Sequence, residues 1–233
     1  MKSKVFTLLT VFLLIPATLF LGTKLTGRSY YLISTLVILE AMLPFFLLFE
    51  RRRPQARELV LVAVMCALAV ASRAAFAWSP FLKPIIGIVM IAGIALGGES
   101  GFLIGAVSAF ASNFMFGQGP WTPWQMMSYG VAGLLAGVVC KKWTERQPLA
   151  LALFGFFATV FLVGPLLDTC TVFTTLTRLT VSSVVAVYAA GIPANLANGI
   201  SVFVTVLLLS KPLLFKLERV KIKYGLLESD EKS

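Results

Sequence analysis

The stretch LVLVAVMCALAVASRAAFAW at Leu59–Trp78 decides the fold, because it is apolar throughout and carries alanine at regular intervals. A helix of about 20 predominantly apolar residues is long enough to cross a bilayer. Ala63, Ala67 and Ala71 share one face of such a helix, since residues four apart are neighbours on its surface. Small residues let helices in a bilayer approach closely. The stretch therefore predicts a membrane helix whose alanine face packs against another helix of this chain or against a partner protein.

The composition extends this interpretation to the whole chain. Of its 233 residues, 58% are hydrophobic and 13% are charged, whereas roughly 25% are charged in a soluble domain. The hydrophobic excess is spread along the sequence, which predicts an all-α polytopic membrane protein. The length allows one compact membrane domain and leaves no room for a soluble enzyme domain.

Eight apolar segments are expected to cross the membrane. The first is interpreted as a retained helix rather than a signal peptide, because no A-x-A cleavage signal follows it. The expected organisation is two N-terminal transmembrane helices in residues 1–50, a basic cytoplasmic linker in 51–57, a six-helix core in 58–215 and a cytoplasmic tail in 216–233. The eight segments are Val5–Leu21, Tyr30–Phe49, Leu59–Trp78, Pro84–Leu96, Gly101–Phe116, Trp121–Cys140, Leu149–Leu167 and Ile192–Leu209.

Charge predicts the topology. The net charge is +10, from 20 Lys and Arg against 10 Asp and Glu, and the basic residues cluster at the ends of the apolar segments. This is the positive-inside signal, with some attraction to anionic lipid, rather than a nucleic-acid site. Eight crossings place both termini in the cytoplasm. Residues 171–190, rich in Thr and Ser and containing Arg178, are expected to form an external loop, with a short interfacial or re-entrant helix as the alternative.

No enzyme signature is present. The chain has no histidine, which excludes Ser-His and Cys-His nucleophiles. It also has no G-x-x-x-x-G-K-[ST] loop for ATP. Cys66, Cys140 and Cys170 are far apart and lack metal-ligand spacing. We interpret the first two as small buried residues, and we expect the third in the external loop without a disulfide partner. Glu40 is the acidic residue near mid-span, serving either ion coupling or a structural polar contact.

Glycine spacing predicts close helix packing in the middle of the chain. Gly97, Gly101 and Gly105 repeat the small-x-x-x-small pattern, and so do Gly133 and Gly137. This pattern favours packing within the chain.

The segment GQGPWTPWQM at 117–126 is the densest group of unusual residues. Its glycines and prolines predict a stiff turn, and its Trp and Gln residues fit either an interfacial belt or a ligand platform. Asn113, Asn195 and Asn198 form a second polar group. They either make interhelical hydrogen bonds or line an external ligand pocket together with the Trp and Gln residues, and Arg178 would cap that pocket. Such a pocket suits a large, mostly neutral molecule with polar edges. The candidate binding residues are Asn113, Gln118, Trp121, Trp124, Gln125, Arg178, Asn195 and Asn198.

Three features together resemble the substrate-binding (S) component of energy-coupling factor (ECF) vitamin transporters. They are the alanine ladder after a basic linker, the GQGPWTPWQM segment, and the GIPANLANGIS and KPLLFKLERVKIKYGLL segments near 191–201 and 211–227. The resemblance covers about residues 57–227 and is strongest to a subgroup that takes up cobalamin. In this family the alanine motif, matched here by Ala63, Ala67 and Ala71, contacts the transmembrane coupling subunit.

The resemblance implies a multi-pass protein of the bacterial cell membrane that binds a vitamin outside, carries no cofactor or metal of its own, and works with two cytosolic ATPases. Riboflavin and a queuosine precursor are alternative substrates. Two other functions stay open: a gradient-driven secondary carrier that uses Glu40, and a membrane scaffold that binds no small molecule.

Overall fold

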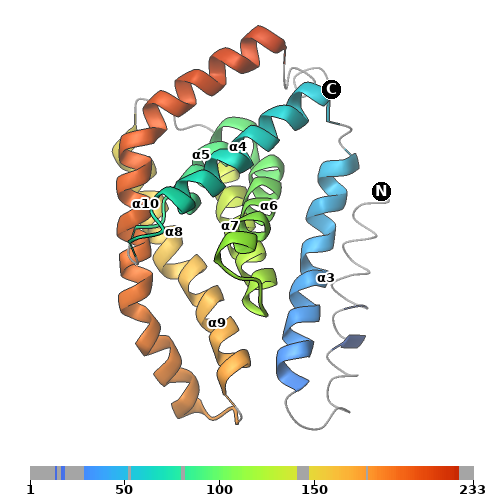
Figure 1. Cartoon of the computed structure of the whole chain (residues 1–233), viewed down its shortest axis with the longest axis vertical. Helices are drawn as coiled ribbons and strands as arrows, with labels where there is room; N and C mark the ends of the chain where they lie inside the picture. The colour runs from blue at the N-terminus through green and yellow to red at the C-terminus, as the bar shows by residue number, and fades with distance from the viewer. Residues whose placement is uncertain are drawn as a thin grey trace.

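The computed structural model describes residues 14, 17–18, 29–51, 54–79, 82–140, 147–176 and 178–225. Every element in this part of the chain is helical, which confirms the all-α class (Figure 1). The elements are α3 (Ser29–Arg51), α4 (Ala56–Ala75), α5 (Ile85–Leu96), α6 (Gly98–Phe116), α7 (Trp121–Val139), α8 (Pro148–Ala158), the π-helical segment η2 (Thr159–Val163), α9 (Gly164–Thr175) and α10 (Val181–Tyr224).

Five of the expected segments are found within a few residues of their predicted ends, as α3 to α7. By length and composition, four helices of the described part can cross a membrane: Leu32–Glu50, Ala56–Ala75, Pro148–Thr175 and Val181–Tyr224. Helix α5 has 12 residues and rises only about 18 Å, less than the roughly 30 Å hydrocarbon core of a bilayer. The first expected segment, Val5–Leu21, lies almost wholly outside the described residues.

The expected external loop at 171–190 is wrong. Helices α8, η2 and α9 form one 28-residue helical stretch that reaches Thr175, and α10 begins at Val181. The threonines of α9 satisfy their hydroxyls inside the helix: Thr174 donates to the Cys170 carbonyl at 2.8 Å and Thr175 to the Thr171 carbonyl at 2.6 Å. Polar composition therefore did not require a loop here. Only a short turn before the Thr180 cap joins the two helices.

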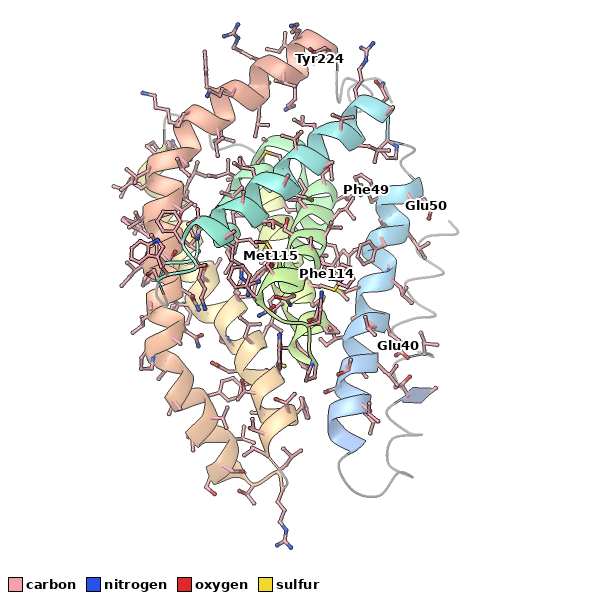
Figure 2. The ribbon with its side chains drawn as sticks, viewed as in Figure 1. Glu40, Phe49, Glu50, Phe114, Met115 and Tyr224 are labelled. Carbon is pink, nitrogen blue, oxygen red and sulfur yellow. The ribbon has the colours of Figure 1, made fainter. Side chains whose placement is uncertain are left out.

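The ends of the first and last helices of the 54–225 region meet. Arg57 Nη1 donates to the Tyr224 carbonyl at 3.5 Å, and its guanidinium lies 5.9 Å from the Tyr224 ring. Figure 2 labels Glu50 and Tyr224 toward the same end of the molecule. We call this the basic end, because Lys211, Lys216, Arg219, Lys221 and Lys223 lie in the last turns of α10. The linker and the start of the tail therefore lie on one side.

Helices α5, α6 and α7 form the centre of the fold. All residues of α5 except Ile94 are buried. A Cβ atom added at Gly101 would clash with the backbone of Gly133, and one at Gly133 would clash with the backbone of Gly101. A Cβ at Gly137 would clash with Gly93 and Gly98. The predicted small-residue packing within the chain is thus confirmed for Gly101, Gly105, Gly133 and Gly137, and it includes Gly93 of α5. It is wrong for Gly97, where an added Cβ would meet no atom within 4 Å.

Helix α4 crosses the outside of this centre obliquely (Figure 1). Val62, Met65, Cys66 and Ala69 are buried against the core. Ala63, Ala67 and Ala71 are exposed. The alanine face therefore has no partner helix among the described residues of this chain.

Helix α3 packs on a different side of the core. Phe45 stacks on Phe102 of α6 with ring centroids 4.2 Å apart, and Phe46 meets the same ring edge-on at 6.0 Å. Ile38 and Met42 of α3 belong to a buried cluster with Trp124 and Cys170. Helix α3 thus covers α6, α7 and α9 and leaves the alanine face open.

We expect Gly133→Ala to lower the free energy of unfolding by about 1–3 kcal/mol, because the added methyl group meets backbone that cannot move aside. Gly155→Ala is the matched control, since the nearest atoms to its methyl group all belong to side chains, those of Val202, Met90 and Val206, and none to backbone. Thermal unfolding in detergent compares the two. Equal stability of both variants would show that the α6–α7 contact is looser than described.

Candidate functional site

Asn113, near the end of α6, is the centre of a polar network that joins α4, α6 and α7. Its side chain is buried. The amide nitrogen donates to Thr122 Oγ1 at 3.0 Å and to Gln125 Oε1 at 2.8 Å, both on α7. The amide oxygen accepts from Arg73 Nη1 of α4 at 2.9 Å. Asn113 therefore ties three helices together.

The turn between α6 and α7 supports this network from outside. Gly117 has a φ of 98°, a conformation that glycine adopts without strain. Gln118 is exposed; its Oε1 accepts from Thr122 Oγ1 at 2.9 Å, and its amide donates to the Phe110 carbonyl at 3.1 Å. Trp121 is also exposed and donates to the Gly117 carbonyl at 3.3 Å. Three of the predicted residues, Asn113, Gln118 and Gln125, thus belong to one hydrogen-bonded network.

The two tryptophans of this segment do not share one environment. Trp124 is 5% exposed and packs on Phe173 of α9, with ring centroids 6.1 Å apart. Its indole nitrogen is buried and has no acceptor in the described part of the chain. An unpaired buried donor is costly, so this N–H marks a position where an acceptor from outside the chain would be favourable.

A second polar group joins α9 and α10. Asn195 Nδ2 donates to Asp168 Oδ2 at 2.7 Å. A Cβ atom at Gly164 would clash with Asn195, and one at Gly191 would clash with Asp168, so glycine at both positions makes room for the pair. The sequence analysis included Asn195 and missed Asp168. The signal was an acid just past the end of the apolar run Leu149–Leu167.

Asn198 and Ser201 extend this group along α10, because residues three apart share a helix face. Asn198 is half-buried and Ser201 is buried. Ser201 Oγ accepts from the Lys83 backbone N–H at 2.6 Å. Burial of Lys83, and to a lesser extent the nearby Arg73 guanidinium, lowers the pKa of its ammonium.

Arg73 belongs to the first polar group and Lys83 to the second. Arg73 bonds to Ser112 and Asn113 on α6, and its guanidinium lies 4.5 Å from the Phe116 ring. The backbone N–H of Lys83 bonds to Ser201 on α10. We call the two polar groups together the polar path; it includes the three predicted asparagines, Asn113, Asn195 and Asn198.

Two residues considered in the sequence analysis lie apart from this path. Arg178 is exposed in the turn before α10. Glu40 is on α3, where Oε1 accepts from Thr18 Oγ1 at 2.6 Å. Figure 2 shows Glu40 on α3, away from Phe114 and Met115 at the end of α6.

The cysteines are buried and have free thiols. This confirms the expectation for Cys66 and Cys140. The expected loop position of Cys170 is wrong, because Cys170 lies within α9 and packs in the cluster that contains Trp124. The described residues contain no group of three or more His, Cys, Asp or Glu side chains suited to a metal ion.

Comparison with known families gives one result. The model of the family described as "ECF-type riboflavin transporter, S component" matches residues 54–214, more than two thirds of the chain. Searches of curated proteins and of solved structures return no match. The matched region begins just before α4 and ends within α10, and α3 lies outside it.

We expect Asn113→Leu to lower the free energy of unfolding by about 1–3 kcal/mol, because Arg73, Thr122 and Gln125 each lose a buried partner. Gln118→Leu is the control from the same network. Its side chain is exposed and water can replace its bonds, so its effect should stay below about 1 kcal/mol. Thermal unfolding in detergent measures both, and a Gln118 effect as large as that of Asn113 would contradict the network described.

Proposed function

This chain belongs to the ECF-type riboflavin transporter S component family, and on that premise we propose that it is the membrane subunit that captures a vitamin for an ATP-driven importer. The match over residues 54–214 is the observation that carries the proposal. The chain itself is then a substrate-binding protein and not an enzyme. ATP is hydrolysed by two cytosolic subunits, and a transmembrane coupling subunit links them to this chain.

The proposed binding site is the polar path from Gln118 and Asn113 to Asn195. The start of α6 lies near the basic end, because Ser100 Oγ donates to Glu58 Oε1 at 3.3 Å, and Asn113 lies at the other end of α6. The positive-inside rule assigns the basic end to the cytoplasm. The site would therefore face outside, and both termini would lie inside a bacterial cell. Trp121 and Trp124 would contribute aromatic surface, and the buried Trp124 N–H would bond to the vitamin.

The proposed coupling surface is the exposed alanine face of α4. Ala63, Ala67 and Ala71 are exposed although the other side of the helix is buried. In lipid, a bare methyl face gains most from close packing with another helix. The loaded chain would dock there and tilt in the membrane to release its vitamin inside.

For the vitamin, we propose cobalamin, supported by the resemblance of the GQGPWTPWQM segment to the cobalamin subgroup. Riboflavin is the second candidate, because the matching family carries its name. A queuosine precursor comes third. All three have flat, polar-edged parts suited to aromatic and amide contacts.

A gradient-driven carrier using Glu40 fits less well. The Glu40 carboxylate bonds to Thr18 on the N-terminal side and takes no part in the polar path. Uptake by this chain alone that depends on pH or sodium, and is lost in Glu40→Gln, would support it instead. A scaffold protein would bind no vitamin at all.

Calorimetry of the purified chain in detergent tests the function, with cobalamin, cobinamide, riboflavin and a queuosine precursor as ligands. We expect sub-micromolar binding of cobalamin without ATP or partner subunits. Trp124→Phe keeps the ring stacked on Phe173 and removes only the indole N–H. We expect it to weaken binding about tenfold, the loss of roughly one hydrogen bond to a buried donor.

Preference for riboflavin or the queuosine precursor would keep the S component function and replace the vitamin. Failure of every vitamin to bind would reject the function. Unchanged affinity in Trp124→Phe would remove this indole from the site.

We expect Ala67→Trp to reduce co-purification with the coupling subunit and ATPases by about tenfold or more, which corresponds to roughly 1.4 kcal/mol. The bulky ring prevents close approach at the methyl face, while vitamin binding stays unchanged. Leu36→Trp is the control, because Leu36 is exposed on α3. Normal assembly of the Ala67 variant would show that the face is not the coupling surface.

A further inference from the structure

We propose that Arg73 and Lys83 form a subsite for an anionic group, a phosphate or a carboxylate, on the transported molecule. This inference rests on the proposed function and narrows its substrate class. Arg73 is bonded to Asn113 of the first polar group, and the backbone N–H of Lys83 is bonded to Ser201 of the second, so a molecule that spans the two groups would meet both residues.

Two hydrogen bonds fix the Arg73 guanidinium, and they use only one of its three nitrogen atoms. Both of its hydrogen bonds come from Nη1, one to Ser112 Oγ and one to Asn113 Oδ1. A guanidinium has five N–H donors, so the donors on Nε and Nη2 have no acceptor among the described residues. They are also not among the fully buried unpaired atoms. An oxyanion can therefore reach a pair of donors in the fork geometry that suits it.

Lys83 supplies the second charge. Its backbone N–H is anchored on Ser201 of α10 at 2.6 Å. Its ammonium has no carboxylate partner in the described part of the chain, although the side chain is half-buried. Lys83 immediately precedes Pro84, the N-cap of α5, so the positive end of the α5 dipole adds to the field of both side chains.

This concentration of positive charge is not neutralised within the described residues. Asp168 is paired with Asn195 and Glu40 with Thr18, and neither forms an ion pair with Arg73 or Lys83. Burial, and to a lesser extent the Arg73 guanidinium, disfavours the charged form of Lys83, so an anion beside the ammonium would favour that form. A purely structural role for Arg73 would need only the bonds to Ser112 and Asn113 and would not need Lys83.

The candidate vitamins differ in whether they carry an anionic phosphate group. Cobalamin carries a phosphodiester and cobinamide lacks it. Riboflavin is neutral, and its phosphate ester, flavin mononucleotide, carries a dianionic phosphate. The flavin pair differs by the phosphate alone and tests recognition of the anionic group itself. Cobinamide also lacks the ribose and dimethylbenzimidazole of cobalamin, so in that pair the charge variants, compared with Lys216→Gln, identify the part of the difference that is due to the phosphate.

The experiment measures the affinity of wild type, Arg73→Gln and Lys83→Gln for both members of each pair, by calorimetry in detergent. Lys216→Gln is the control, because Lys216 is exposed near the basic end and has the same charge. We expect the phosphate-bearing member of the preferred pair to bind wild type at least about tenfold more tightly. Each site variant should abolish that difference, and Lys216→Gln should keep it.

A second measurement uses inorganic phosphate alone, with chloride at equal ionic strength as reference. We expect phosphate at millimolar concentration to raise the unfolding temperature of wild type and of Lys216→Gln, and to have no effect on Lys83→Gln. This arm keeps the test decisive if Arg73→Gln does not fold, because Lys83→Gln leaves the anchoring backbone bond to Ser201 intact.

The outcomes separate the two proposals. Tight vitamin binding with no preference for the phosphate-bearing member, or equal losses for both members in the variants, overturns the anionic subsite and leaves the S component function standing. No vitamin binding with a phosphate response specific to wild type and Lys216→Gln overturns the function and supports the subsite. Absence of both responses overturns both.

Discussion

The contact of α6 and α7 at Gly101 and Gly133 is the constraint on which the rest of the structure depends. Backbone meets backbone there, so the two helices have a fixed separation along their length. That separation brings Asn113, near the end of α6, within hydrogen-bond distance of Thr122 and Gln125 at the start of α7. Asn113 then positions the Arg73 guanidinium of α4. A contact between glycines at the buried centre of the fold thus determines the geometry of the polar groups at the end of α6.

The fold separates three surfaces that a capture subunit needs. Polar and aromatic side chains gather at one end, the cations of α10 gather at the basic end, and the alanine face of α4 lies exposed between them. Helix α3 adds apolar cover to α6, α7 and α9 without reaching that face. The additional N-terminal region is therefore compatible with both ligand capture and docking, as far as its described residues extend.

The sequence predicted the helices α3 to α7 well, because long apolar runs in lipid must form helices to satisfy their backbone. It failed at 171–190, where threonine hydroxyls bond to carbonyls of their own helix and polar composition imitates a loop. For the candidate site, composition identified Asn113, Gln125 and Asn195, but not Asp168 or Lys83, whose significance depends on neighbours distant in sequence. It also grouped Trp121 with Trp124. Trp121 is exposed in the first turn of α7, whereas Trp124 is covered by Phe173 of α9, a neighbour distant in sequence.

Helix α10 has 44 residues and would extend about 66 Å if straight, roughly twice the hydrocarbon thickness. Figure 1 shows its last part leaning over the bundle toward the start of α4, and Pro212 lies within this helix. A hydrogen bond from Arg57 to the Tyr224 carbonyl links the start of α4 to the end of α10. The cations beyond Pro212 favour the headgroup layer and resist entry into hydrocarbon. If the core tilts in the bilayer as proposed, the charged end of α10 would stay in the headgroup layer, and the opposite end of the bundle would move through the larger distance.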